Sequence, residues 1–313
     1  MGVSVLLQDQ ADRTAARRES VRAERWLLTG ATGQLGRHLI ALIGADPDRP
    51  AACLATSRRG GAVAGLSVQA LDMRDADELD RLLADHRPTH VVHLASLSQP
   101  TQAHADPQGF HDLTVQATWR LARHVRAVGG WMFYPSSDFV LCGDGPGLRD
   151  EGAAVCGDSV YARGKLAGER VVLESGAGCV GRLSLLWGTT ADDTPWGQLV
   201  GRLLAGQAVH GITDELRTPL QFAAAARIVM ALAAAGPASH RGHRGLVNIG
   251  GDRAMTPFAL ISQLRDTVAP GSAVLPVTRA AYSPAVPRPA NAALDIGLLR
   301  DVLGASVLRA IGA

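Results

Sequence analysis

The sequence predicts an α/β fold, a doubly wound parallel sheet with a smaller C-terminal region. Three observations lead to this fold class. Short apolar runs alternate with segments of helical spacing from Arg25 onward, as in successive strand–helix units. A glycine-rich string follows the first apolar run and opens a helical segment. After Leu186 the alternation weakens and glycines and prolines gather, which indicates a smaller region that covers the sheet.

Seven apolar segments have the composition of strands that are buried on both faces of a parallel sheet. The expected strands are Trp26–Thr29, Ala51–Thr56, Ser67–Leu71, Thr89–Ala95, Trp131–Pro135, Cys179–Leu186 and Leu246–Ile249. Segments between them repeat apolar residues at helical spacing. The expected helices are Gln34–Ile43, Ala76–His86, Leu113–Val128, Ser159–Glu174, Trp196–Ala205 and Phe222–Ala235. Asp75, three positions before Glu78, and Thr256, just before a proline, are expected helix caps.

The charge of the chain is nearly balanced, with 31 basic and 29 acidic side chains and a formal net charge of +2. Such a chain lacks the basic field that nucleic acid binding needs, and no apolar run approaches the roughly 18 residues of a membrane helix. We therefore expect neither nucleic acid nor a membrane as a partner. The ten histidines show no metal-ligand spacing, so we expect no metal site.

The four cysteines occur singly, without a CxxC pair, and the N-terminus lacks the apolar region of a secretory signal. They are Cys53, Cys142, Cys156 and Cys179. We expect reduced thiols and a cytoplasmic protein. Neither Cys142 nor Cys156 has a neighbouring base in the sequence, so we assign them no catalytic role.

Residues 29 to 36 read TGATGQLG, between the first expected strand and the first expected helix. Glycine suits this turn because a missing Cβ lets a pyrophosphate approach the backbone, while the helix start offers free N–H groups. We therefore predict a dinucleotide-binding turn. The residues expected at the cofactor here are Gly30, Thr32, Gly33, Gln34, Leu35 and Gly36. A glycine-rich loop without a ligand is the alternative.

The second expected strand ends in Ser57, Arg58 and Arg59, where a site for NAD normally places an acidic residue on the ribose hydroxyls. Guanidinium groups have the forked geometry that suits a ribose 2′-phosphate. The sequence therefore favours NADPH (NADP), with NADH as the alternative cofactor and exposed loop arginines as the alternative interpretation. Asp72 and Met73 close the third strand and are expected to face the adenine, although a capping role also suits Asp72.

Lys165 is the only lysine among the 31 basic residues, and Tyr161 lies four positions before it. On a helix the two side chains share one face. A phenol has a reference pKa near 10, and a cation within ~4–6 Å stabilises its anion. We therefore expect Lys165 to lower the pKa of Tyr161, which acts as a general acid or base. Ser137 follows an apolar strand, at the sheet edge where ligands bind, and is expected to hydrogen-bond the substrate oxygen.

Several motifs occur in order between residues 25 and 300: TGATGQLG, VVHLAS, PSSDFV, YARGKLAGE, VGRLSLLWG, RTPLQF and RPANAALD. Together they resemble an extended short-chain dehydrogenase/reductase, and most closely the dTDP-4-dehydrorhamnose reductase family of sugar-nucleotide reductases. The resemblance implies a Rossmann fold in which Ser137, Tyr161 and Lys165 form the catalytic triad and Lys165 also binds the nicotinamide ribose. It further implies a strand end along the cofactor that carries Leu94, Ala95 and Ser96.

The expected domain organisation follows the change of pattern along the chain. Residues 1–24 form a flexible N-terminal extension, residues 25–180 and 220–250 the dinucleotide-binding domain, and residues 181–219 and 251–313 the substrate-binding region. The residues expected at the substrate are Ser98, Asp138, Phe139, Trp187, Trp196 and Arg217. Core packing is the alternative role for the two tryptophans, and a surface ion pair for Arg217. Arg182, inside a strand, is expected to be structural.

Three departures from the family pattern bear on the substrate. Leu113-Thr114 stands where the family has the asparagine of its VN motif, Gly164 replaces the serine of YxxSK, and Ala223-Ala224 replaces an acidic pair. We therefore expect substrate recognition to differ from that of a rhamnose-pathway enzyme.

These observations predict an NADPH-dependent reduction of a ketone on a sugar or sugar-like molecule, free or nucleotide-linked, with Tyr161 as the general acid. Phe139 stands where dehydratases of the superfamily carry a second acid, which favours simple reduction over elimination. A NAD(P)-dependent sugar epimerase is the alternative within the same class. A noncatalytic NADP-binding regulatory subunit is the alternative from a different class. Relatives of this kind also form homodimers, which we adopt here as an analogy.

Overall fold

The computed structural model describes residues 24–46, 52–143, 145–237 and 245–304. Within these ranges an eight-stranded sheet has the strand order β11-β7-β6-β5-β1-β2-β4-β3. The strands are β1 Arg25–Thr29, β2 Ala52–Ser57, β3 Gly61–Val63, β4 Leu66–Ala70, β5 His90–His93, β6 Trp131–Ser137, β7 Gly178–Leu183 and β11 Leu246–Ile249. All neighbouring pairs are parallel except β3 with β4. The predicted doubly wound parallel sheet is confirmed.

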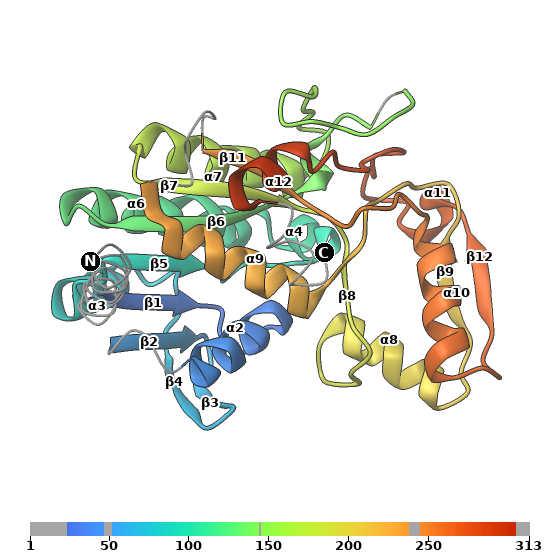
Figure 1. The fold of residues 1–313 in the computed structure, drawn as a ribbon, viewed down its shortest axis with the longest axis horizontal. Coiled ribbons are helices and arrows are strands. Elements are labelled where there is room, and N and C mark those ends of the chain that lie inside the picture. Colours follow the sequence, from blue (N-terminus) through green and yellow to red (C-terminus); the bar gives the residue numbers. More distant parts are fainter. Residues whose placement is uncertain (1–23, 47–51, 144, 238–244, 305–313) are drawn as a thin grey trace, which may run out of the picture.

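Helices cover both faces of this sheet (Figure 1). One face carries α2 (Gln34–Ala45), α9 (Phe222–Ala235) and α12 (Gly297–Leu303), and the other carries α3 (Ala76–His86), α6 (Ala117–Ala127) and α7 (Val160–Ser175). Each face has its own buried apolar core. Because β1 lies between β2 and β5, the strand order reverses there, and ligands of α/β folds bind beside such a reversal at the carboxyl ends of the strands.

All seven expected strands are present, with ends that differ by at most three residues. The two predicted caps are also present: Asp75 accepts a hydrogen bond from the Glu78 N–H at 2.9 Å, and Thr256 accepts one from Ala259 at 3.1 Å. The short edge strand β3 was not predicted, because three residues give no periodicity that could reveal it.

The helix expected over residues 113–128 is interrupted in the structure. A π-helical turn spans Asp112–Gln116, between α5 (Pro107–His111) and α6, and a further short helix, α4 (Pro100–Ala105), precedes it. Each of the two short helices has a proline in its first turn, and Asp106 caps the second through the Gly109 N–H. Helical structure therefore begins before the apolar periodicity does.

A second lobe lies beyond the carboxyl ends of the central strands (Figure 1). It contains α8 (Pro195–Leu204), β9 (Val209–Ile212), α10 (Pro257–Val268), β12 (Val274–Val277) and α11 (Arg279–Tyr282). β9 and β12 pair in parallel, and Val200, Leu203 and Ile261 are among the residues of its small apolar core. A second two-stranded pair, β8 (Leu186–Trp187) with β10 (Leu220–Gln221), adjoins the main sheet. The elements of the second lobe all lie within residues 181–219 and 251–313, the ranges expected to form the substrate-binding region. That division of the chain into two domains stays a prediction.

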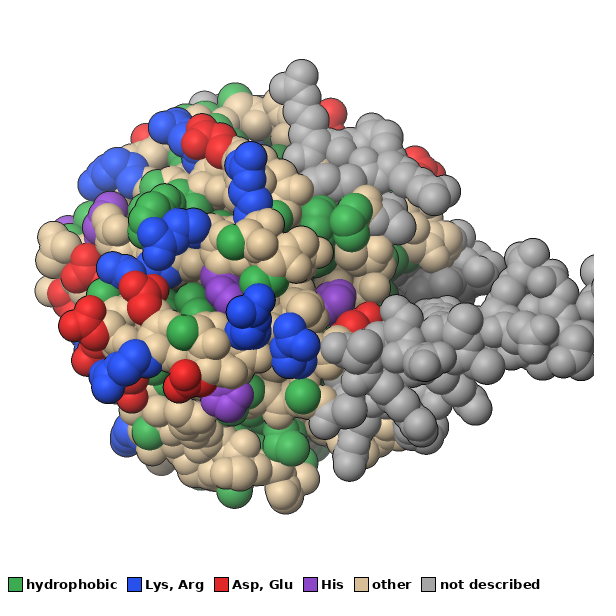
Figure 2. All heavy atoms as spheres, turned by 90° about the vertical axis from the view of Figure 1, so that its left-hand side faces the viewer, with side chains coloured by type: hydrophobic (Ala, Val, Ile, Leu, Met, Phe, Trp, Pro, Cys, Tyr) green, Lys and Arg blue, Asp and Glu red, His purple; other side chains and the backbone are tan. Residues whose placement is uncertain are grey.

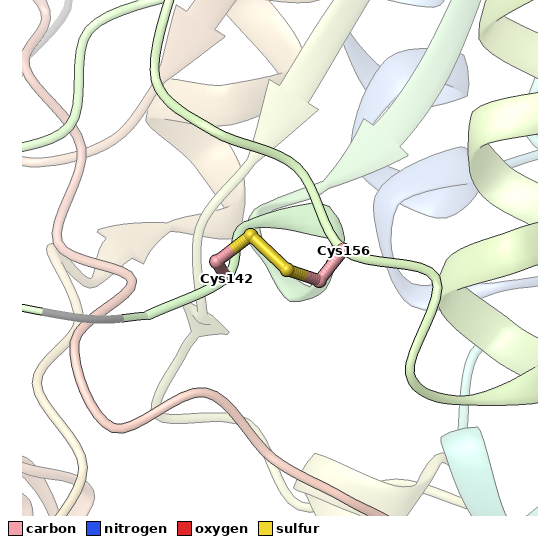
Figure 3. The surroundings of a disulfide bond; sticks show 2 residues. All are labelled: Cys142 and Cys156. Atoms are coloured by element: carbon pink, nitrogen blue, oxygen red, sulfur yellow. A yellow bond between two sulfur atoms is a disulfide. The ribbon is translucent and has the colours of Figure 1, made fainter.

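Two of the expected reduced thiols are in fact joined. Cys142 and Cys156 form a disulfide with a Cα–Cα distance of 4.8 Å (Figure 3). The chain leaves β6, turns and comes back, so that Leu141 pairs antiparallel with Val155 and brings the two cysteines together. The prediction of free thiols at both positions is therefore wrong, and the expectation of a cytoplasmic protein loses that support. Cys53 and Cys179 form no disulfide with another described residue, and burial raises the pKa of Cys53 to about 11.

The surface agrees with the balanced composition. Figure 2 shows the face opposite the second lobe, where basic and acidic side chains lie interspersed over the described residues. No helix in the described ranges combines the length and the apolar character that a bilayer crossing requires. The expected N-terminal extension, apart from Glu24, lies outside the described residues.

Candidate active site

A cleft of about 780 Å³ runs along the carboxyl ends of the strands and continues between the sheet and the second lobe. Every residue expected at the cofactor lines this cleft. Among the residues expected at the substrate, Ser98, Phe139, Trp196 and Arg217 line it too. The structure thus brings together, in one cavity, side chains that come from both halves of the sequence.

The glycine turn forms one wall of the cleft. Gly30 has a φ of +68°, and a Cβ there would lie 2.7 Å from the backbone of Leu94 and Ala95. A Cβ at Gly36 would lie 2.5 Å from the carbonyl oxygen of Gly30, so the helix start packs directly on the turn. α2 begins after Gly33 without a side-chain cap, which leaves backbone N–H groups of its first turn available to an anion.

The end of β2 brings polar side chains to the same wall. Ser57 is buried, whereas Arg58 and Arg59 are exposed and line the cleft. Asp72 forms an ion pair with Arg74 at 2.6 Å. This side-chain hydrogen bond from Arg74 holds the pKa of Asp72 below its usual value, partly against burial. Arg58 and Arg59 are thus exposed guanidinium groups of this wall, and a third, Arg74, is paired with Asp72.

The predicted strand along the cofactor ends at His93, and Leu94, Ala95 and Ser96 follow as irregular backbone that lines the cleft. Thr29 fixes this segment to β1: its Oγ1 accepts a hydrogen bond from the Ala95 N–H at 3.1 Å and lies 2.8 Å from Nδ1 of His93. Burial lowers the pKa of His93 to about 3, so this imidazole is neutral. The contact holds the glycine turn and the strand end in a fixed relation.

The three residues predicted as the catalytic triad meet in the middle of the cleft. Ser137 is the last residue of β6, while Tyr161 and Lys165 lie one turn apart on α7. All three side chains are at least nine-tenths buried. Lys165 Nζ donates a hydrogen bond to the carbonyl oxygen of Pro135 at 3.0 Å and lies 5.9 Å from the centre of the Tyr161 ring. The helical spacing therefore brings the ammonium and the phenol to the same cleft.

The expected lowering of the Tyr161 pKa is not found. Burial raises the pKa of this phenol to about 12, although a hydrogen bond with Ser137 opposes the increase. Burial also lowers the pKa of Lys165 to about 8, which Glu169 opposes. The physical reason is that desolvation outweighs the stabilisation of the phenolate by Ser137 and Arg217. Lys165 Nζ forms its hydrogen bond with the Pro135 carbonyl.

Two phenylalanines hold the Tyr161 ring. Phe110 stacks on it with a centroid distance of 5.4 Å and an interplanar angle of 20°. Phe139 meets it edge to face at 5.9 Å. Phe110 packs against Gly164, where a Cβ would lie 2.4 Å from its ring. Phe110 therefore occupies the space that a side chain at position 164 would need, and the same ring packs on Tyr161.

A buried network of carboxylates and guanidiniums borders the cleft. Arg217 hydrogen-bonds both oxygens of Asp138 and also Glu215, at 2.8 Å. Arg288 binds the same Glu215 through two hydrogen bonds of 2.7 and 3.0 Å. Both guanidiniums lie over the Phe139 ring, at 4.8 and 4.7 Å from its centre. The interpretation of Arg217 as a surface ion pair is therefore wrong, because its pair is buried.

Two residues expected at the substrate do not reach the cleft. Asp138 is completely buried beneath Arg217, and Trp187 packs on the core of the second lobe. Trp196 lies at the cleft and donates from its indole N–H to the Gly188 carbonyl at 2.8 Å.

Three functional neighbours were not predicted: Phe110, Glu169 and Arg288. For these three residues, the sequence offered one indication: Glu169 lies four residues after Lys165 and therefore on the same face of the helix.

Thr114, noted in place of the family asparagine, lies in the π-helical turn and is buried. Among the described side chains, no group of three histidines, cysteines or acids is placed to hold a metal ion.

Comparison with known proteins identifies relatives over part of the chain. The dTDP-4-dehydrorhamnose reductase of Streptomyces griseus is 35% identical over 150 residues, which cover 48% of this chain and 45% of the relative. Methionine adenosyltransferase 2 subunit beta of Pongo abelii is 31% identical over 165 residues, which cover 52% of this chain and 47% of that protein. The chain thus spans about half the length of the curated relatives it matches.

A solved structure and a family model extend the comparison to most of the chain. The dTDP-4-dehydrorhamnose reductase of Bacillus anthracis, solved in complex with NADP, superimposes with a TM-score of 0.74 at 20% identity, covering 88% of this chain and 92% of that one. This likeness confirms the Rossmann-like fold. The family model described as RmlD substrate binding domain matches residues 24–309. The chain therefore belongs to the RmlD substrate binding domain family.

Proposed function

We propose that this protein is an NADPH-dependent ketoreductase that acts on a sugar or sugar-like ketone, free or nucleotide-linked. The observation that carries the proposal is the meeting of Ser137, Tyr161 and Lys165 in a cleft that begins at a glycine turn. The reductases of Streptomyces griseus and Bacillus anthracis support it as relatives of that activity. NADPH would supply a hydride to the carbonyl carbon when bound.

The residues present fit such a cofactor. The turn at Gly30 leaves no room for a Cβ, and the uncapped start of α2 offers N–H groups to a pyrophosphate. Arg58 and Arg59 are exposed at the end of β2, where they can bind a ribose 2′-phosphate. Lys165 keeps hydrogen-bonding capacity beyond its bond to Pro135, since an ammonium has three donors. It would use that capacity on the nicotinamide ribose.

The protein's own share of the reaction is proton transfer and orientation. A phenol whose pKa is about 12 stays protonated at neutral pH, as a general acid must before it acts. Tyr161 Oη would donate its proton to the carbonyl oxygen as negative charge develops there, and Ser137 Oγ would orient the same oxygen. Lys165, charged and close to the ring, would stabilise the phenolate that results. Phe110 and Phe139 keep the ring in place.

Tyr161→Phe tests the proposal. It removes the proton donor and keeps the ring that Phe110 and Phe139 pack against. We expect NADPH consumption with a keto-sugar substrate to fall ~10²–10⁴-fold, whereas NADPH affinity, measured by fluorescence, stays unchanged. Full turnover in this variant would refute the mechanism.

Arg58→Ala tests the cofactor. We expect it to weaken NADPH much more than NADH, because only NADPH carries the 2′-phosphate. Equal losses for the two cofactors would remove the assignment.

A second candidate function is supported by the resemblance to methionine adenosyltransferase 2 subunit beta. In that case the chain would bind NADPH without turnover and would co-purify with a partner protein. Incubation with NADPH and a panel of keto-sugars distinguishes the two, since a regulatory subunit leaves the absorbance at 340 nm constant with every ketone. An epimerase, the third possibility, would convert its substrate with no net oxidation of the cofactor.

The cytoplasmic location and the homodimer remain predictions. Light scattering after size-exclusion chromatography would measure the oligomeric state, and cell fractionation would test the location.

A further inference from the structure

A buried polar cluster lies behind Lys165, and the proposed mechanism does not use it. It consists of Ser136 on β6, Glu169 on α7 and Arg182 on β7. Glu169 and Arg182 are each 4% exposed, and two hydrogen bonds join them, from Nε to Oε1 at 3.0 Å and from Nη2 to Oε2 at 2.9 Å. Ser136 donates a third hydrogen bond to Oε1 of the same carboxylate. A buried carboxylate with three such bonds has a fixed position.

This cluster belongs to a regular contact between β6 and α7. Tyr161, Lys165 and Glu169 lie one turn apart on α7, and each contacts one of three consecutive residues of β6. The pairs are Ser137 with Tyr161, Pro135 with Lys165, and Ser136 with Glu169. Gly168 lets the helix come this close, because a Cβ there would lie 2.2 Å from the Tyr134 hydroxyl. The carboxylate is therefore part of what sets the helix against the strand end.

The electrostatic surroundings of Lys165 give Glu169 a distinct role. The titratable groups around Lys165 are His93 on β5, Tyr134 on β6, and Tyr161 with Glu169 on α7. Arg182 on β7 is bonded to Glu169. His93 is neutral, because burial lowers its pKa to about 3. Burial raises the pKa of both tyrosines, so they are neutral too. Among these described groups Glu169 is thus the one with a negative charge.

We propose that Glu169 is a positioning residue of this site: it holds the Lys165 ammonium charged and in register with β6, while Arg182 and Ser136 hold the carboxylate. The role rests on the proposed function, since a charged Lys165 matters for proton transfer from Tyr161. Burial lowers the pKa of Lys165 to about 8 even though Glu169 opposes that change. Without the carboxylate, a large fraction of Lys165 would be neutral at physiological pH.

The charge of Lys165 can be measured without any substrate. Because Lys165 is the only lysine of the chain, protein labelled with [6-¹³C]lysine and carrying a lysine-free tag gives a single side-chain carbon signal. Its chemical shift against pH reports the pKa of this one group. We expect the wild-type protein to titrate near the value of about 8.

Variants on the two sides of the ion pair should move this pKa in opposite directions. Glu169→Gln removes the negative charge and leaves that of Arg182, so the Lys165 pKa should fall by ~1 unit or more. Arg182→Met removes the positive charge and leaves that of Glu169, so the pKa should rise. Glu169→Asp keeps the charge and should titrate close to wild type. Glu174→Gln, an exposed glutamate on the same helix, is the matched control and should leave the pKa unchanged.

An unchanged Lys165 pKa in a folded Glu169→Gln protein would overturn the proposal, as would a shift of the same sign in the Glu169→Gln and Arg182→Met proteins. If Glu169→Gln does not fold, Arg182→Met and Glu169→Asp supply the same comparison. The alkaline limb of kcat/KM against pH should then move with the measured pKa. A protein that shows the pKa shifts but no ketone reduction would refute the proposed function and leave the role of Glu169 in place.

Discussion

The packing of Phe110 against Gly164 makes a prediction whose sign opposes helix propensity. Gly164 lies inside α7, and a glycine-to-alanine change inside a helix ordinarily stabilises by ~1 kcal/mol. At this position, however, the new methyl group would lie 2.4 Å from the ring of Phe110, which is itself only 1% exposed and stacked on Tyr161. Overpacking of this kind costs ~1–3 kcal/mol. We therefore expect Gly164→Ala to destabilise the protein by up to ~2 kcal/mol.

Gly201→Ala provides the matched control. Gly201 lies inside α8, and a Cβ there would meet its nearest neighbour, the Cβ of Ala191, at 3.8 Å, which is ordinary contact. The gain in helix propensity is common to both variants, so their free energies of unfolding should differ by the overpacking cost alone, ~1–3 kcal/mol. Urea unfolding followed by tryptophan fluorescence measures both. If Gly164→Ala stabilises the protein as much as Gly201→Ala does, the packing argument is refuted.

The same substitution should also slow the proposed ketone reduction. A displaced Phe110 moves the Tyr161 ring, and misplacement of a catalytic group by about 1 Å costs up to ~10²-fold in rate. Phe110→Leu shortens the side chain that the methyl group would strike, so in the Gly164→Ala background it should recover stability. The double-mutant cycle should show a favourable coupling of at least ~0.5 kcal/mol. If the changes in the free energy of unfolding of Gly164→Ala and Phe110→Leu were additive, the methyl group at position 164 and the Phe110 ring would not compete for the same space.

Three further predictions follow from the buried groups. Replacing Cys142 and Cys156 by serine should lower the free energy of unfolding by ~3 kcal/mol, as expected when a closed loop of about 15 residues is opened. A reductant should produce the same loss in the wild-type protein and no loss in the serine variant. Arg217→Met leaves Asp138 buried without its guanidinium and should cost ~3–5 kcal/mol in urea unfolding, whereas Arg217→Met with Asp138→Asn should recover part of the loss. Burial lowers the pKa of His93 from 6.5 to about 3, so between these pH values the unfolded chain binds a proton at His93 and the folded protein does not. The free energy of unfolding is therefore retained above about pH 6.5 and falls as the pH drops toward 3. His93→Gln should lose less stability between pH 6.5 and 3, and equal losses in the two proteins would contradict the assignment.

The sequence predicts the parts of this protein whose cause is local. Buried strands are continuous apolar runs, so β1, β6 and β11 could be placed within two residues. The glycine turn is predictable because its conformation depends on missing Cβ atoms within eight residues. Tyr161 and Lys165 face the same cleft because four residues make about one helical turn.

The parts that sequence reasoning missed depend on contacts between distant segments. Cys142 and Cys156 meet because the loop after β6 returns along itself, a pairing that the spacing of two cysteines does not reveal. Phe110 reaches Tyr161 across more than fifty residues, and Arg288 reaches Glu215 across seventy-three. The raised pKa of Tyr161 had the same origin, because the extent of burial depends on the complete packing and not on a neighbour four residues away.

Consecutive residues at the end of β6 bind different neighbours. Ser137 forms a hydrogen bond with Tyr161 and Ser136 donates one to Glu169, so that both serines line the cleft and contact α7. Asp138, the next residue, binds Arg217, whose segment leads from the second lobe back to the sheet. The carboxylate of Asp138 also raises the pKa of Tyr161, and Arg217 opposes that increase. A displacement of Arg217 would therefore change the pKa of Tyr161, both directly and through Asp138.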